Sequence, residues 1–188
     1  MTEFVYITGI NGVGKTSLAE RAAKLGGWQY VSASGLLRHA YSKANSSELE
    51  KCSQKDLDAS FTAAFLGILA NSDKKVLLDT HAVVFLDDGT EIPDDLTNLF
   101  PFALGIIHIN ATPSTILDRC RNDNGDGKKI RNQVCIDVIK HRSEVSLQHA
   151  NRMSQAGGFS CIEFQNDVNG LDERAYSLMV VIQNLKRL

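Results

Sequence analysis

Short apolar runs separated by longer stretches of helical periodicity run along this chain. Five runs rich in β-branched and aromatic residues are typical of buried strands, at residues 4–8, 28–31, 76–79, 102–110 and 159–164. The helical pattern is clearest over residues 54–71, where Leu57, Phe61, Ala64, Phe65, Ile68 and Leu69 share one face. Strands that alternate with helices predict a three-layer α/β/α fold with a five-stranded, mostly parallel sheet and a site at the strands' carboxyl ends.

The remaining helices are predicted from caps and apolar stripes. The first covers residues 16–24 and ends at Gly26-Gly27, and the second starts at Ser32 or Ser34. Later helices are expected at residues 113–121, with Thr112 as cap, and at 130–154 and 171–185. The turn-rich segment 82–99 is predicted to be a hairpin or an irregular loop, and residues 122–127 form a polar, glycine-containing cluster.

The loop after the first strand carries the strongest motif. Gly9-Ile10-Asn11-Gly12-Val13-Gly14-Lys15-Thr16 matches G-x-x-x-x-G-K-[ST], whose backbone N–H groups hold phosphate at the start of a helix. The alternative is a glycine-rich turn with an accidental Lys-Thr, but the strand before it and the helix after it favour a phosphate loop. The predicted ATP-binding residues are therefore Gly9, Asn11, Gly12, Val13, Gly14, Lys15, Thr16 and Ser17.

A single carboxylate is the best candidate for organising a metal ion. Asp79 ends the apolar run 76–79, the position at which a parallel sheet presents groups to a ligand. With the Thr16 hydroxyl, Asp79 is predicted to organise Mg²⁺, while Lys15 reaches the β- and γ-phosphates. The alternative reading of Asp79 is a helix cap, although Thr80-His81 opens no obvious helix.

Arginines are the groups expected to neutralise a transferring phosphoryl group. Arg119, Arg121, Arg131 and Arg142 bracket the glycine-containing cluster, so residues 119–131 are predicted to form a lid that carries cations onto bound phosphates. Arg38 follows the second strand, one turn into the next helix. The alternative for each arginine is a solvated surface charge.

Composition narrows the possible classes of protein. The 188 residues suit one domain, and the net charge of −2 gives no general attraction to nucleic acid or to anionic membranes. No apolar run approaches the roughly 20 residues of a membrane span, so a cytoplasmic protein is expected. The four cysteines form no C-x-x-C pair and give zinc no support. The oligomeric state stays open.

Two further segments carry a family resemblance. Ser32-Ala33-Ser34-Gly35-Leu36-Leu37-Arg38 resembles the S-T-G-D-[LM]-L-R segment of nucleoside monophosphate kinases, and Asp79-Thr80-His81-Ala82-Val83 is similar to the D-T-H-A-[VI] segment of archaeal-type adenylate kinases. The resemblance to the archaeal type covers most of the chain, with the matching segments in the same order. Ala33 and Gly35 depart from the usual threonine and aspartate, and Val83 takes the place of the acceptor-binding arginine of the commoner D-G-F-P-R form.

The resemblance implies an enzyme that transfers the γ-phosphoryl group of ATP to a nucleoside monophosphate, AMP above all, with Mg²⁺. An acceptor-binding region at residues 32–71 would use Ser34, Arg38, Asp79 and His81, and the lid arginines Arg119, Arg121, Arg131 and Arg142 would act with Lys15 in catalysis. For His81, a structural histidine is an equal alternative.

Two other functions remain open. One is a nucleotide-dependent ATPase or switch that acts on a protein partner, although it would leave Arg38 without an obvious task. The other is a kinase whose acceptor is a small metabolite or a nucleic-acid 5′ end. The chain has no continuous basic stripe with interleaved aromatic residues, so the nucleic-acid version has little support.

Overall fold

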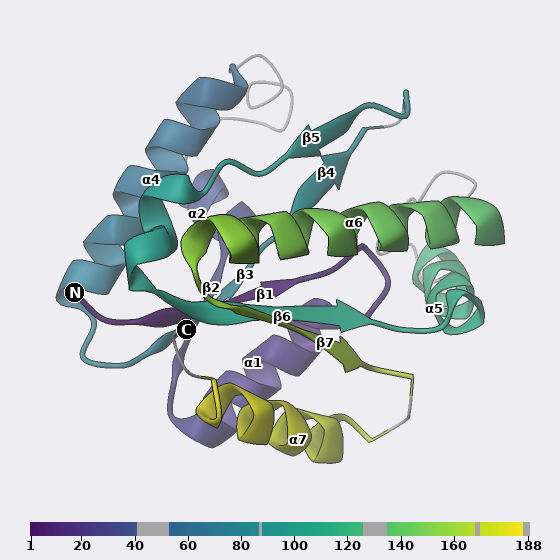
Figure 1. Cartoon of the computed structure of the whole chain (residues 1–188). Coiled ribbons are helices and arrows are strands. Elements are labelled where there is room, and N and C mark those ends of the chain that lie inside the picture. The colour runs from purple at the N-terminus through teal and green to yellow at the C-terminus, as the bar shows by residue number, and fades with distance from the viewer. Residues whose placement is uncertain (41–52, 87, 126–134, 168–169, 186–188) are drawn as a thin grey trace.

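A parallel sheet forms the centre of the molecule in a computed structural model, which describes residues 1–40, 53–86, 88–125, 135–167 and 170–185. Its five strands have the order β2-β3-β1-β6-β7, and every neighbouring pair is parallel. Helices cover both faces, so the predicted three-layer α/β/α fold is confirmed (Figure 1).

The strands lie within one or two residues of the predicted runs. They are β1 (Phe4–Thr8), β2 (Gln29–Ser32), β3 (Val76–Asp79), β6 (Ala103–Asn110) and β7 (Ser160–Gln165). Strand β6 starts at Ala103 rather than Phe102 because residues 97–102, which include Pro101, form the 3₁₀ helix η1 (Thr97–Phe102). A proline fits a short helix better than a paired interior strand.

The helices confirm the predicted set but correct several ends. They are α1 (Lys15–Gly26), α2 (Ala33–Ala40), α4 (Gln54–Asn71), α5 (Pro113–Gly125), α6 (Ile136–Gly157) and α7 (Leu171–Gln183). Helix α5 continues four residues past the predicted end at residue 121, so the start of the polar cluster is helical. Helix α6 was predicted over 130–154, but it begins at Ile136 and ends where Gly158 adopts a left-handed conformation. Residues 126–134 lie outside the described ranges.

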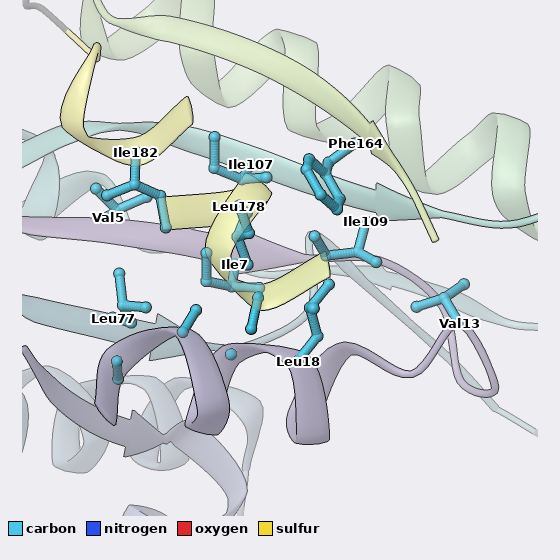
Figure 2. Close-up of a cluster of buried hydrophobic side chains, with 14 of the residues drawn as sticks. Val5, Ile7, Val13, Leu18, Leu77, Ile107, Ile109, Phe164, Leu178 and Ile182 are labelled. Carbon is cyan, nitrogen blue, oxygen red and sulfur yellow. The ribbon is translucent and has the colours of Figure 1, made fainter. Parts of the chain in front are cut away.

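The sheet separates two apolar clusters because successive side chains of a strand point to opposite faces. Val5, Ile7 and Leu77 face α1 and α7, where they meet Leu18 and Leu178. Figure 2 shows this cluster, with Val13 of the glycine-rich loop at its edge beside Ile109. On the other face, α4, α6 and η1 cover the second cluster, built around Phe4, Tyr6, Phe65, Leu99 and Phe159.

The turn-rich segment after β3 is a hairpin, one of the two predicted alternatives. Strands β4 (Val83–Phe85) and β5 (Glu91–Pro93) pair antiparallel. Two contacts join the hairpin to α6. The carboxylate of Glu91 lies 3.0 Å from His141 Nε2, and the guanidinium of Arg142 lies 5.2 Å from the centre of the Phe85 ring. No helix within the described ranges is long and apolar enough to span a bilayer.

Candidate nucleotide-binding site

The loop between β1 and α1 has two glycines at positions where a side chain would lie very close to neighbouring atoms. Gly9 has φ +139°, and a Cβ there would lie 2.3 Å from the carbonyl oxygen of Ile109 on β6. Gly14 has φ +81°, and its Cβ would lie 2.8 Å from Nδ2 of Asn166. Both positions combine a positive φ with a close approach of neighbouring groups, so the geometry of this loop favours glycine at both.

Lys15, Thr16 and Asp79 meet at the carboxyl end of β3, as the sequence predicted for a shared site. Lys15 Nζ lies 3.2 Å from Asp79 Oδ1, and Thr16 Oγ1 donates a hydrogen bond of 2.8 Å to Asp79 Oδ2. Lys15 is 7% exposed and Asp79 is 6% exposed. The buried ammonium of Lys15 therefore lies at the start of α1, paired with the Asp79 carboxylate. Phosphate oxygens could take the place of that carboxylate as its partner.

Tyr30 is a member of this group that the sequence did not reveal. Its hydroxyl donates a hydrogen bond of 2.9 Å to Asp79 Oδ2. Burial and the neighbouring Asp79 carboxylate raise the pKa of the Tyr30 hydroxyl, so it is a donor at all ordinary pH values. The parallel register places Tyr30 beside Leu77 and Ser32 beside Asp79, so Tyr30 reaches Asp79 diagonally across the two strands.

A second feature that the sequence did not reveal is a set of hydrogen bonds from Arg119 and Asn166 to the glycine-rich loop, here called the Arg119 clasp. The carbonyl oxygen of Val13 accepts hydrogen bonds from Asn166 Nδ2 at 2.8 Å and from Arg119 Nη1 at 3.0 Å. Arg119 Nη2 also donates to the carbonyl oxygen of Asn166 at 2.8 Å. The guanidinium of Arg119 thus joins α5 and the β7–α7 connection to the phosphate loop.

The predicted acceptor residues occupy the elements that follow β2 and β3. Ser34 and Arg38 are exposed on α2, and His81 lies half-buried between β3 and β4. Ser32 is the residue that caps α2, since its Oγ accepts a hydrogen bond of 3.3 Å from the N–H of Gly35 and lies 3.1 Å from Ser34 Oγ.

The predicted lid arginines are spread over two helices. Arg119 and Arg121 lie on α5, and Arg142 lies on α6 against Phe85 of the hairpin. Arg121 is exposed, whereas Arg119 is held by the clasp on Val13. Arg131 lies outside the described residues.

His108 is buried on the opposite face of the sheet from Asp79, and Asp94 is half-buried beside Thr80. His108 Nδ1 lies 3.1 Å from Thr8 Oγ1, directly before the loop, and burial lowers the pKa of His108 to about 4. Asp94 accepts a hydrogen bond of 3.0 Å from the Thr80 hydroxyl. Burial, with smaller contributions from the nearby carboxylates of Asp58 and Asp95, raises the pKa of Asp94 to about 6 despite that bond.

The oxygen donors at the end of β3 fit a magnesium ion bound together with a triphosphate. A hydroxyl and a carboxylate 2.8 Å apart are hard ligands of the kind that Mg²⁺ prefers. Within the described residues no cluster of three or more His, Cys, Asp or Glu side chains could hold a metal ion. That finding is compatible with Mg²⁺, which at phosphate sites takes one or two protein ligands and fills its other positions with phosphate oxygens and water.

The parallel sheet, the glycine-rich loop and the carboxylate at the end of β3 define the class of P-loop nucleotide-binding folds. A family model described as an AAA domain matches residues 8–137, which is more than half of the 188 residues. The chain therefore belongs to this AAA domain family. No protein of curated function matches its sequence.

Solved structures of two kinases share the fold. A shikimate kinase from Bacteroides thetaiotaomicron superposes with a TM-score of 0.62 at 13% identity, over 96% of this chain and 98% of the kinase. A gluconokinase from Sinorhizobium meliloti 1021 superposes with a TM-score of 0.55 at 15% identity, over 96% of this chain and 93% of the kinase. At identities this low, the two comparisons establish a shared fold alone.

Proposed function

We propose that the chain is an ATP-dependent phosphotransferase whose acceptor is a nucleoside monophosphate, with AMP as the expected acceptor. The observation that carries the proposal is the convergence of Lys15, Thr16 and Asp79 at the carboxyl end of the sheet. Phosphoryl transfer depends mainly on positioning and charge neutralisation, and these three side chains supply both on the donor side.

On the donor side, the loop amides and Lys15 bind the phosphates, while Thr16 and Asp79 hold Mg²⁺. Bound Mg²⁺ neutralises charge on the phosphates. Lys15 exchanges its contact with Asp79 for one with phosphate oxygens. The Arg119 clasp keeps the loop in shape from outside, and Arg121, Arg131 and Arg142 supply further positive charge from residues 119–131 and α6.

On the acceptor side, residues 32–71 form the binding region. Arg38 binds the acceptor phosphate from α2, which also carries Ser34, and His81 contributes from the connection between β3 and β4. Strands β2 and β3 are paired, with Ser32 opposite Asp79, so α2 starts next to the donor site. An acceptor phosphate is already an anion, so the transfer needs little general-base assistance.

A small-molecule acceptor is the second candidate. It is supported by Gly35, which stands where monophosphate kinases usually carry an aspartate, and by the fold shared with a shikimate kinase and a gluconokinase. An alcohol acceptor must lose a proton, and Asp94, with its pKa raised to about 6, lies hydrogen-bonded to the residue after Asp79.

A product screen distinguishes the candidates. The protein is incubated with Mg²⁺, ATP and one acceptor at a time, including each nucleoside monophosphate, shikimate and gluconate, and the products are separated. ADP formed in excess over ATP consumed, with AMP as the acceptor, supports the proposal. Transfer to an organic acid alone would replace it with the second candidate. ATP hydrolysis without transfer to any acceptor, raised by a protein partner, would favour a switch.

A further inference from the structure

Tyr30 occupies the junction between the candidate donor site and the start of α2. Its ring packs against the apolar cluster on the α1 face of the sheet, while its hydroxyl donates to Asp79 Oδ2 at 2.9 Å. Ser32 lies two residues further along β2, on the same face of the strand as Tyr30 and opposite Asp79 in the register. Packing therefore fixes the ring, and the hydroxyl has a defined charged acceptor.

The three donors around Asp79 respond differently when MgATP binds. The Lys15 ammonium is needed by the phosphates and leaves Oδ1. Thr16 can continue to donate its proton to Oδ2, because its oxygen keeps lone pairs for a cation. The Tyr30 hydroxyl also donates to Oδ2, so its hydrogen bond to Asp79 is a second contact that the exchange leaves in place.

We propose that Tyr30 is a positioning residue for magnesium, whose hydroxyl holds the Asp79 carboxylate in the orientation in which Asp79 and Thr16 accept Mg²⁺ with ATP. Residues that hydrogen-bond a metal-ligating carboxylate fix its direction and so tune affinity for the metal. The inference rests on the proposed function, since it adds Tyr30 to the same site.

The test replaces only the hydroxyl. Tyr30→Phe keeps the ring in the apolar cluster, and ATP binding is measured by equilibrium dialysis at stepped Mg²⁺ concentrations. The half-saturating Mg²⁺ concentration should rise about tenfold, as expected for loss of a residue that orients a metal ligand. ATP binding in the presence of a chelator should be unchanged. Tyr176→Phe is the matched control, because Tyr176 is 67% exposed on α7 and should alter neither quantity.

A double-mutant cycle separates positioning from a general structural effect. If Tyr30 acts through Asp79, Tyr30→Phe should add no further change in Mg²⁺ requirement when Asp79→Asn is already present. An equal rise in both backgrounds, or a Tyr30→Phe protein with the wild-type Mg²⁺ requirement, would overturn the inference. If the wild-type protein shows no Mg²⁺-dependent ATP binding at all, the proposed function is wrong and the inference is wrong with it.

Discussion

Among single residues, Lys15 pairs with Asp79 and is also the side chain that we propose binds the phosphates of ATP. The Lys15 ammonium lies 3.2 Å from Asp79 Oδ1, so the charge of this buried carboxylate is compensated. The same ammonium is the group that should stabilise charge on the transferring phosphates. Removing the Lys15 ammonium should therefore weaken catalysis, because it no longer stabilises charge on the phosphates. The same change also breaks the ion pair with Asp79.

Lys15→Ala should lower phosphoryl transfer by about 100-fold to 1,000-fold, the usual cost of removing one charge-stabilising group. The fold should persist, because Thr16 and Tyr30 still donate to Asp79. Initial rates measure the first effect, and far-ultraviolet circular dichroism with thermal unfolding measures the second. A variant that transfers phosphate at the wild-type rate would remove Lys15 from the donor site.

Arg38→Ala should weaken acceptor binding far more than ATP binding. Loss of a charged partner of a bound phosphate costs about 2–5 kcal/mol, whereas the ATP phosphates are expected to rely on Lys15 and the loop. Separate calorimetric titrations of AMP and ATP check the difference. Lys24→Ala, which removes an exposed cation near the end of α1, is the control. Equal losses for the two nucleotides would mean that Arg38 does not belong to the acceptor site.

At the element scale, the junction of β1 with the glycine-rich loop depends on a neighbouring strand. Gly9→Ala would place a Cβ 2.3 Å from the Ile109 carbonyl oxygen, at φ +139°. The substitution should lower the free energy of unfolding by about 2–4 kcal/mol, from overpacking and backbone strain together. Urea denaturation measures the change.

Gly27→Ala provides the matched comparison for Gly9→Ala. Gly27 also has a positive φ, +69°, but a Cβ there would meet nothing within 4 Å. Only the strain remains, so the expected loss is about 1 kcal/mol. Equal losses at the two positions would show that the contact with Ile109 is not what requires glycine in the loop.

Elements defined by local patterns were predictable from the sequence, and their ends were less so. Helix α4 runs from Gln54 to Asn71 as its apolar stripe predicted, and the structure adds Ser53 as its N-terminal cap. Helix α5 continues to Gly125, beyond its predicted end at residue 121. Its last residues are rich in asparagine and aspartate, which have a low helix propensity, but propensity is a weak signal that tertiary context can override.

The site could be predicted only where its members lie within a motif or at a strand end. Lys15, Thr16 and Asp79 met that condition. Tyr30 and Asn166 did not, because their partners lie 49 and 153 residues away along the chain. Strand register decides which side chains meet across such separations, and a single sequence does not state the register.

For the molecule as a whole, His108 and Asp94 change stability in opposite directions as the pH falls. His108 has its pKa lowered from 6.5 to about 4, so the folded state binds fewer protons than the unfolded state, and stability falls as the pH drops through this range. Asp94 has its pKa raised from 3.8 to about 6, so the folded state binds more protons, and stability rises as the pH drops. Each contribution is at most about 3 kcal/mol.

These opposite effects should largely cancel in the wild-type protein between about pH 4 and pH 6.5. Asp94→Asn should therefore be more stable than the wild type at pH 7.5, by about 1–3 kcal/mol, with the advantage disappearing toward pH 4. His108→Gln should lose less stability than the wild type on acidification over the same range. Urea denaturation at four or five pH values measures both differences, and two parallel profiles would contradict the assignment.

The hydrogen bond between Asn166 and Val13 also has a consequence for biosynthesis. Strand β1 is the middle strand of the sheet, so both of its neighbours, β3 and β6, are made after it. The glycine-rich loop packs against the Ile109 carbonyl at Gly9, and its Val13 carbonyl accepts a hydrogen bond from Asn166, 153 residues later in the chain. Closing a loop of this length costs conformational entropy, and Asn166 must be synthesised before the contact can form. A ribosome-bound nascent chain that carries the complete glycine-rich motif should therefore acquire nucleotide affinity only after β7 and the residue following it have emerged from the ribosome.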